Sequence, residues 1–181
     1  MKQVNFISSN PEKLEAARKA FQDTDIQLKQ VPNRYPEIQA DSSLEIARHT
    51  ARKASKDFDS AVIREDHSMF LEAVPGFPGP YISYFDDELP VEKLLKLLEN
   101  AESRKAKFVI ATVLYDGEFH EFETEVGIEI AEQPRGDSGN WNKVLKLENA
   151  EKTFAESDPG QRLEIWNRNL RRVAEKLSDQ S

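Results

Sequence analysis

Three polar residues, Ser8, Ser9 and Asn10, stand between an apolar segment and Pro11, and Lys13 follows one helical turn later. Proline is favoured at the first position of a helix, so this pattern predicts a strand that leads into a helix start. A helix start presents free N–H groups and the positive end of the helix dipole, which together suit a phosphate group. An ordinary helix cap beside a solvated lysine has the same local pattern. The residues therefore leave a phosphate site and a plain cap both open.

Two acidic groups could supply a metal site. Glu37 lies on a proline-flanked loop, and Glu65 and Asp66 stand where a short apolar strand is expected to end. Carboxylates at strand ends lie where ligands usually bind in α/β sheets, and Mg²⁺ prefers such hard oxygen ligands. A bound metal lowers the pKa of a water molecule, and a neighbouring carboxylate can accept the proton. Because the chain has 33 acidic residues, some fall at strand ends by chance, so a magnesium site and a solvated surface both stay open.

Arginines gather near the carboxyl end of the chain, where apolar residues recur at helical spacing from Leu163 to Leu177. Arg168 falls beside this apolar stripe and not on it. The planar guanidinium group of arginine suits a phosphate or a purine oxygen. Arginines on a helix are also typical of a solvated face, so their spacing alone does not assign a site.

The elements that must position these residues follow from hydrophobic periodicity and turn signals. Strands and helices alternate in the first half of the chain, and a hairpin is predicted later around Asp116 and Gly117. This order predicts an α/β fold with a mixed sheet. The expected strands cover 4–7, 26–31, 61–63, 107–115 and 118–130, the expected helices cover 11–21, 43–55, 91–98 and 158–177, and residues 75–80 are expected to lie outside regular structure.

The composition excludes several classes of protein. The chain has no cysteine, which excludes disulfides, thiolate metal sites and cysteine nucleophiles, and which fits a reducing compartment such as the cytoplasm. A net charge of −8 over 181 residues argues against a nucleic-acid polymer as partner, so any anionic ligand needs a local basic site. No apolar run approaches the roughly 20 residues that span a bilayer, so no membrane partner is expected.

Several motifs then occur in one order along the chain. They are Ser8-Ser9-Asn10 with Lys13, Glu37–Asp41, Glu45–Ala47, Val62–Ser68, Gly76–Ile82, Pro134–Gly136, Trp141, Thr153–Glu156 and Arg168. In this order the chain resembles the inosine/xanthosine triphosphate pyrophosphatase (dITP/XTP pyrophosphatase, ITPase-like) family over almost its whole length. The acidic motif followed by Gly76–Ile82 is the most specific part of the resemblance.

The resemblance implies an elongated mixed β-sheet flanked by helices, with two lobes and a central nucleotide cleft, in a single ITPase-like domain over residues 1–181. It also implies Mg²⁺-dependent hydrolysis of a nucleoside triphosphate, normally a deaminated purine nucleotide, to the monophosphate and pyrophosphate. Members of the family are usually homodimers. In this chain Phe77, Tyr81, Tyr84 and Phe85 could supply an apolar contact surface for a second copy.

The resemblance also implies roles for single residues. Asp66 would bind the metal or activate water, and Lys13 would stabilise charge on the leaving group together with Arg162. Arg168 would contact the base. Metal ligands would come from Glu37, Glu65 and Asp66, and the substrate would be bound by Ser8, Ser9, Asn10, Lys13, Trp141, Asn142, Arg162, Asn167 and Arg168.

Several positions depart from the pattern of the family, and five of them bear most directly on substrate binding. Asn142 replaces an aspartate, Asn167 replaces a histidine, and Gly139 replaces a stacking aromatic residue. A hydrogen-bonding site rejects ligands that leave its buried polar groups unpaired, so these changes predict an altered base specificity. Thr50 and Ser83 stand where the family has a lysine and an often basic residue, which predicts weaker phosphate binding.

The leading hypothesis is therefore a Mg²⁺-dependent nucleoside triphosphate pyrophosphatase with altered base specificity. The alternative is a catalytically impaired nucleotide-binding or interaction protein on the same fold, since part of the cation set is missing. A structural domain without a ligand is the third interpretation.

Overall fold

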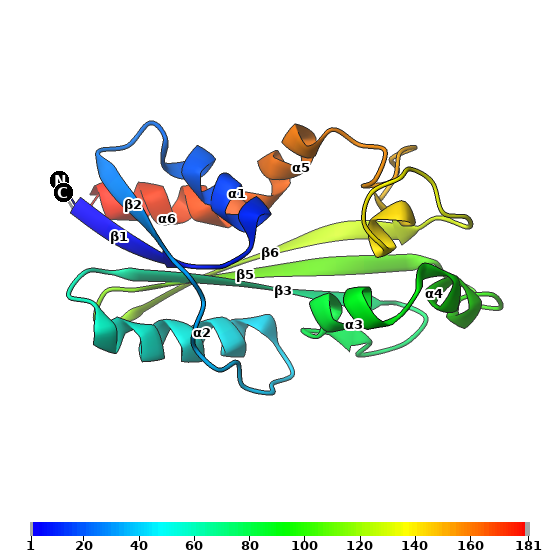
Figure 1. Cartoon of the computed structure of the whole chain (residues 1–181), viewed down its shortest axis with the longest axis horizontal. Coiled ribbons are helices and arrows are strands. Elements are labelled where there is room, and N and C mark those ends of the chain that lie inside the picture. The colour runs from blue at the N-terminus through cyan, green and yellow to red at the C-terminus, as the bar shows by residue number, and fades with distance from the viewer. Residues whose placement is uncertain (1, 180–181) are drawn as a thin grey trace. The chain divides into compact units, whose positions relative to one another are not determined.

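The computed structural model describes residues 2–179 and has an α/β fold in which helices flank a mixed β-sheet (Figure 1). This confirms the predicted fold class. The elements are β1 (Lys2–Ile7), α1 (Pro11–Phe21), β2 (Ile26–Val31), α2 (Ser43–Ala54), η1 (Ser55–Asp57), β3 (Val62–Leu71), β4 (Pro78–Gly79), α3 (Ile82–Glu88), α4 (Val91–Leu97), β5 (Lys105–Tyr115), β6 (Phe119–Ile130), η2 (Trp141–Lys143), β7 (Leu145–Leu147), α5 (Pro159–Trp166) and α6 (Arg168–Asp179).

The strands follow the order β2-β1-β3-β5-β6-β7, and β4 pairs with β3 beside this path. Strand β1 is parallel to both β2 and β3, whereas β4 is antiparallel to β3 and β7 is antiparallel to β6. Both orientations therefore occur in one sheet, as the mixture of strand–helix alternation and a hairpin predicts.

The chain divides into two compact units. Unit 1 comprises Met1–Asp66, Ile110–Thr124 and Leu163–Ser181, and unit 2 comprises His67–Val109 and Glu125–Arg162. The division passes through β3, β5 and β6. The single domain over 1–181 and the cleft between two lobes stay predictions.

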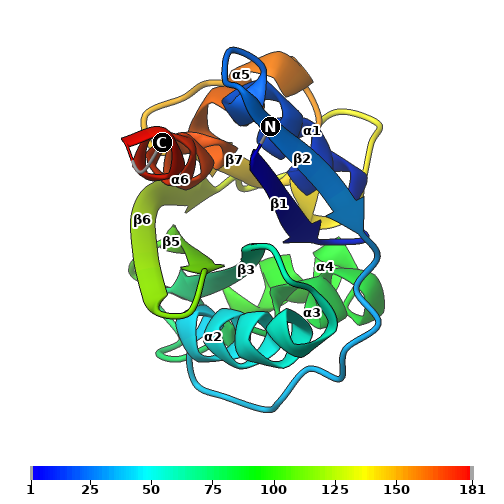
Figure 2. The same ribbon diagram turned by 90° about the vertical axis from the view of Figure 1, so that its left-hand side faces the viewer.

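In unit 1, helices α1 and α6 cover one face of the sheet and α2 covers the other (Figure 2). Phe6 of β1 belongs to an apolar cluster with Leu14 of α1 and Leu170 of α6. Ile7, the next residue, belongs to a second cluster with Ala47 of α2, because successive side chains of a strand point to opposite faces. The chain therefore leaves the end of β1 between two helical layers, where the polar residues Ser8–Asn10 begin.

A half-buried loop residue, Asn140, links several elements of unit 2. The Nδ2 of Asn140 donates to the carbonyl of Asp86 at 2.6 Å and to that of Leu89 at 2.9 Å, and its Oδ1 accepts from the backbone N–H of Val91 at 3.0 Å. One asparagine thus joins the end of α3 and the start of α4 to the loop before η2.

The strand predicted over 61–63 is longer than expected, which corrects the expectation that the charged run Arg64–Asp66 ends it. Strand β3 continues to Leu71. Buried charged groups are tolerated when they have partners, and Arg64 donates to the carbonyl of Ile7 while the Glu65 carboxylate accepts from Thr112. Asp66 therefore lies within the strand and not at its end.

Two further expectations are corrected. The single helix predicted over 158–177 is divided into α5 and α6 at Asn167, a residue type whose short amide disfavours helix interiors. The segment 75–80 contains the two-residue strand β4, whose Pro78 and Gly79 pair with Phe70 and Met69.

In the described part of the chain, no helix is both long and apolar enough to cross a membrane.

Candidate active site

The polar residues after β1 form a helix cap. The Asn10 Oδ1 accepts from the backbone N–H groups of Glu12 at 2.9 Å and Lys13 at 3.3 Å, and Pro11 occupies the first helical position. Ser8 is buried, and its Oγ accepts from the backbone N–H of Asn10 at 3.2 Å. The predicted cap is thus confirmed, and a phosphate at this helix start stays a prediction. The solvated lysine expected beside a plain cap is corrected, because Lys13 is half-buried.

Lys13 reaches from α1 to the middle of β3. Its Nζ donates to the backbone carbonyl of Glu65 at 3.2 Å. Burial lowers the pKa of Lys13, the negative charges of Asp66 and Glu65 oppose that shift, and the positive charge of Arg64 adds to it. A lysine in this setting holds a positive charge beside carboxylates with little help from solvent, which suits it to bind an anion.

Asp66 is the acidic group most affected by its surroundings. Burial raises the pKa of Asp66 to about 6, against the opposing effect of the cations Lys13 and Arg64. Its side chain is 14% exposed, so the carboxylate keeps some access to solvent. A carboxylate with a pKa near 6 is able to accept a proton from water at neutral pH.

Arg64 is the residue that sequence reasoning missed as part of the site. It is buried, its Nη1 donates to the carbonyl of Ile7 at 3.2 Å, and its Nη2 lies 2.5 Å from Glu37 Oε1 and 3.6 Å from Asp66 Oδ1. A signal was present in the sequence, since a basic residue directly follows the predicted apolar strand 61–63 and directly precedes two acidic residues. The structure therefore groups Lys13, Glu37, Arg64 and Asp66, which we call the β3 cluster.

Glu65 differs from its neighbours on β3. Side chains alternate along a strand, so Arg64 and Asp66 share one face and Glu65 points to the other. The carboxylate of Glu65 is buried and accepts a hydrogen bond from the hydroxyl of Thr112 on β5 at 2.8 Å. A role for Glu65 as a metal ligand stays a prediction, and the geometry does not place its side chain beside that of Asp66.

Other predicted substrate contacts of unit 1 lie on the surface or in the interior. Ser9 is exposed, and its Oγ accepts from the backbone N–H of Asn33 at 3.0 Å. Arg168 is exposed at the start of α6. Asn167 is fully buried at the α5–α6 break, and neither atom of its amide has a hydrogen-bond partner among residues 2–179.

Three predicted substrate contacts belong to unit 2. Trp141 is fully buried, its backbone N–H donates to Asp86 Oδ1 at 2.8 Å, and its indole N–H donates to the carbonyl of Leu89 at 2.8 Å. Asn142 is half-buried, and Arg162 lies over the ring of Phe154 at 5.8 Å. These contacts explain how the three residues are held, and their roles toward a substrate stay predictions.

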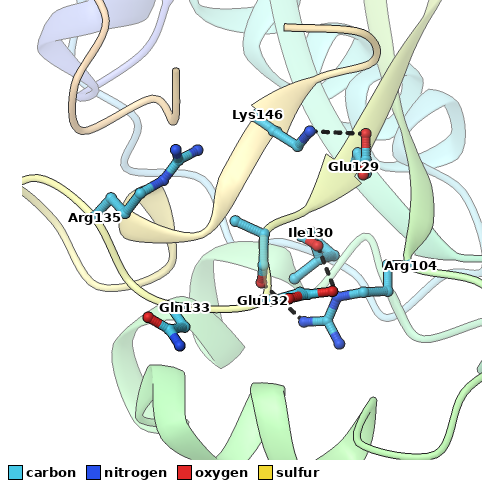
Figure 3. A pocket seen from close by; sticks show the side chains of 8 residues that line it. Arg104, Glu129, Ile130, Glu132, Gln133, Arg135 and Lys146 are labelled. Carbon is cyan, nitrogen blue, oxygen red and sulfur yellow. Dashed lines mark hydrogen bonds and ion pairs between the residues drawn. The ribbon is translucent and has the colours of Figure 1, made fainter. Parts of the chain in front are cut away.

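Unit 2 also contains a hollow of about 380 Å³, which we call the basic pocket (Figure 3). Its cations are Arg104, Arg135 and Lys146. Arg104 donates to the carbonyls of Ile130, Ala131 and Leu98 at 2.8–3.3 Å. Arg135 donates to the carbonyl of Glu151 at 2.6 Å, and Lys146 lies 2.9 Å from Glu129. Each of these cations is already engaged by the chain itself.

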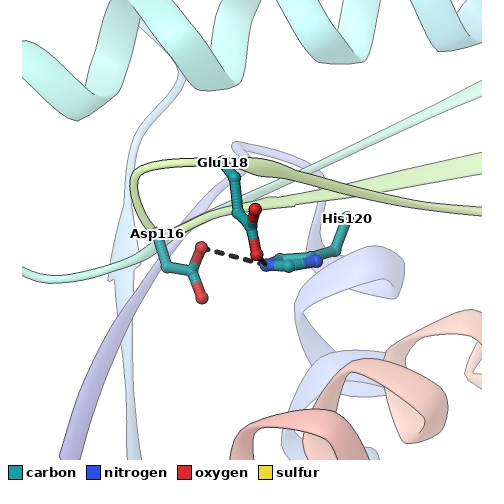
Figure 4. A group of neighbouring side chains, drawn as sticks. All are labelled: Asp116, Glu118 and His120. Carbon is teal, nitrogen blue, oxygen red and sulfur yellow. Dashed lines mark hydrogen bonds and ion pairs between the residues drawn. The ribbon is translucent and has the colours of Figure 1, made fainter.

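A third polar group lies at the β5–β6 hairpin (Figure 4). His120 Nε2 lies 3.0 Å from Asp116 Oδ1 and 3.6 Å from Glu118 Oε1, although the histidines are scattered in the sequence. One ligand atom from each residue lies within 4.8 Å of the others. The alternation of side chains around a tight hairpin explains the grouping. The two carboxylates already serve His120 as partners.

The carboxylates of the β3 cluster fit a magnesium ion by the chemistry of their donors. Glu37 and Asp66 offer hard anionic oxygens from a loop and a strand, and Mg²⁺ is usually held by one or two carboxylates with substrate phosphates completing its shell. Because Glu37 is half exposed, a cation can approach it from solvent.

Comparisons with known proteins identify relatives over almost the whole chain. The model of the Ham1 family matches residues 4–177. A dITP/XTP pyrophosphatase of Thermococcus kodakarensis is 36% identical over 177 residues, which cover 96% of each chain. A dITP/XTP pyrophosphatase of Methanopyrus kandleri is 38% identical over 178 residues, which cover 95% of this chain and 94% of that protein. The solved structure of a HAM1 protein from Coxiella burnetii has the same fold, with a TM-score of 0.83 and 23% identity over 99% of this chain and all of that one.

Proposed function

The chain belongs to the Ham1 family, and on that premise we propose that it is a nucleoside triphosphate diphosphatase of the dITP/XTP pyrophosphatase type. It hydrolyses a nucleoside triphosphate between the α- and β-phosphates and releases the monophosphate and pyrophosphate. The observation that carries this proposal is the β3 cluster, which groups a poorly solvated lysine with two carboxylates near a helix start. A polyphosphate needs that combination of fixed positive charge and metal-binding oxygens.

Each residue of the proposed site has a chemical task. The ammonium group of Lys13 binds a phosphate oxygen and offsets charge on the departing pyrophosphate, and the positive end of the α1 dipole adds to this effect. Mg²⁺, when bound by Glu37 and Asp66, neutralises part of the triphosphate charge and makes water more acidic. Asp66, with a pKa of about 6, is the group suited to take the proton of the attacking water.

The base specificity is proposed to differ from that of the family because of Asn142 and Asn167. The amide of Asn167 is buried with both its donor and its acceptor unused among the described residues. A histidine or an aspartate in such a place presents a different set of donors and acceptors. A neutral amide therefore favours a different nucleotide base from the one that an aspartate carboxylate or a histidine imidazole favours.

The proposed enzyme is a cytoplasmic homodimer. The aromatic segment before and within α3 leaves Tyr84 62% exposed and Tyr81 40% exposed, while Phe85 packs edge-to-face with Phe77 at 4.7 Å. Exposed aromatic side chains supported by packed ones are typical of an interface core. The absence of cysteine from the sequence fits a reducing compartment.

A nucleotide panel tests the proposal. The purified protein is incubated with Mg²⁺ and, separately, dITP, ITP, XTP, GTP and ATP, and products are separated by anion-exchange chromatography. We expect the monophosphate and pyrophosphate in equal amounts, and no product after chelation of the metal. Release of orthophosphate, or tight nucleotide binding by calorimetry without any turnover, would contradict the proposed activity and favour the binding-protein alternative.

A further inference from the structure

Arg64 is a buried cation inside the group that the proposed function assigns to a divalent metal. Its side chain is 7% exposed, and the same Nη2 lies 2.5 Å from Glu37 and 3.6 Å from Asp66. The two proposed metal ligands are therefore also the two counter-ions of one guanidinium group. A divalent metal bound by Glu37 and Asp66 would therefore lie beside this positive charge.

The guanidinium group is anchored at one end. Ile7 and Arg64 are register partners in the parallel β1–β3 pair, and Nη1 donates to the carbonyl of Ile7 at 3.2 Å. The Nε of Arg64 has no hydrogen-bond partner among the residues described. Arg64 is thus tied to the backbone through Nη1, and the bond from Nη2 to Glu37 is the one that can be exchanged with the least rearrangement of the strand.

Glu37 is the more exchangeable of the two carboxylates. It lies outside the helices and strands, it is half exposed, and its Oε1 also accepts from Asn33 Nδ2 at 3.1 Å. A magnesium ion binds carboxylate oxygens at about 2.1 Å and demands regular geometry around it. An ion so close to Glu37 would meet the Arg64 charge at short range, and because the Arg64 side chain is only 7% exposed, solvent screens the repulsion between these like charges poorly.

We propose, on the basis of the proposed function, that Arg64 is an internal counter-ion that competes with the divalent metal for Glu37 and Asp66. In the metal-free protein Arg64 offsets the repulsion between the two carboxylates. Metal binding replaces the Arg64–Glu37 ion pair by a metal–Glu37 bond, while Nη1 stays on the carbonyl of Ile7. Arg64 is therefore a positioning residue that raises the metal concentration at which the site fills.

Direct metal binding tests the competition. Isothermal titration of the nucleotide-free protein with Mn²⁺ or Mg²⁺ is compared between the wild type, Arg64→Met and Arg64→Lys. We expect Arg64→Met to bind the metal about tenfold more tightly, because a nearby unit charge has gone, and Arg64→Lys to stay close to the wild type. Arg48→Met is the matched control, since Arg48 forms an exposed pair with Glu121 at 2.6 Å in the same unit and should leave metal affinity unchanged.

The result that would overturn the proposal is equal or weaker metal binding by Arg64→Met. Because a buried arginine on β3 supports the fold, circular dichroism must first show that the variant is folded. If Arg64→Met does not fold, a measurement on the wild-type protein tests the same proposal. The side-chain Nε–Hε signal of Arg64 is followed by NMR during a Mg²⁺ titration, and we expect it to shift with the same midpoint as the backbone signals of Glu37. An Arg64 signal that stays in place while the Glu37 signals move would overturn the proposal, as would the absence of any metal-dependent shift.

These readouts separate the two proposals. Both measure metal binding without nucleotide, so they do not depend on turnover. If the nucleotide panel gives pyrophosphate but Arg64→Met does not tighten metal binding, the competition is wrong and the proposed function stands. If Arg64→Met tightens metal binding but no nucleotide is hydrolysed, the competition stands and the proposed function is wrong.

Discussion

The β3 cluster of unit 1 and the basic pocket of unit 2 both gather cations beside acidic residues, but they differ in how those charges are satisfied. In the basic pocket Arg104 donates to three backbone carbonyls, and Lys146 pairs with one carboxylate. In the β3 cluster Arg64 is shared between two carboxylates. Burial lowers the pKa of Lys13 and raises the pKa of Asp66, and each shift favours the neutral form of the group. A site for a charged ligand is marked by groups whose charges are incompletely compensated, and the number of cations alone does not reveal it.

The largest effect should come from Asp66→Asn. The amide keeps the size of the side chain but cannot accept a proton or bind a metal as an anion. We expect kcat/KM for the best nucleotide to fall by about 10³-fold, measured as pyrophosphate release. Asp25→Asn, which changes an exposed aspartate elsewhere in unit 1, should leave activity unchanged. An Asp66→Asn variant with wild-type activity would remove Asp66 from the mechanism.

A direct contrast between the two regions is given by two lysines. Lys13→Met removes the charge that lies beside the carboxylates of β3, and we expect kcat/KM to fall by about 10²-fold because the phosphates lose a preorganised cation. Lys146→Met removes a lysine of the basic pocket that already pairs with Glu129, and it should change kcat/KM less than twofold. If Lys146→Met is the impaired variant and Lys13→Met is not, the triphosphate binds at the basic pocket and not at the β3 cluster.

The sequence predicted the local parts of this site well. Asn10 caps α1, as the run of polar residues before Pro11 indicates, and a hairpin forms around Asp116 and Gly117. Each of these features depends on residues within a few positions of one another. The cap at Asn10 could therefore be predicted from neighbouring residues alone, whereas these residues do not decide whether a phosphate binds there.

The part that could not be predicted depends on partners far apart in the chain. The strand that was expected to end at residue 63 continues because Arg64 finds the carbonyl of Ile7 and because Glu65 finds the hydroxyl of Thr112. Neither partner is near in sequence, and a charged run without a visible partner reads as the end of a strand. The same non-local pairing explains why Arg64 is absent from the residues that the sequence predicts for the site, whereas Lys13, Glu37 and Asp66 are predicted from residue type and motif.

The basic pocket should respond to mutation in stability and not in activity. Arg104→Met removes three hydrogen bonds from a charged donor to backbone carbonyls. We expect the free energy of unfolding to fall by about 3 kcal/mol, measured by urea denaturation, because the carbonyls of Ile130 and Ala131 lose a charged donor. The activity of the folded variant should equal that of the wild type. A loss of activity at unchanged stability would instead give the pocket a role in binding the substrate.

In the β3 cluster a substitution should cost activity but add stability. We expect Asp66→Asn to stabilise the metal-free protein. Burial raises the pKa of Asp66 from an ordinary 3.8 to about 6, so the folded state binds this proton more tightly than the unfolded state does. The contribution of Asp66 is therefore most favourable below pH 4 and is lost as the pH rises from about 4 to 6. We expect Asp66→Asn to raise the free energy of unfolding by about 1–3 kcal/mol at pH 7, measured by urea denaturation without metal, and to have little effect at pH 4. A variant that is less stable than the wild type at pH 7 would mean that Lys13 and Arg64 compensate the buried carboxylate fully, and the contrast with the basic pocket would then no longer hold.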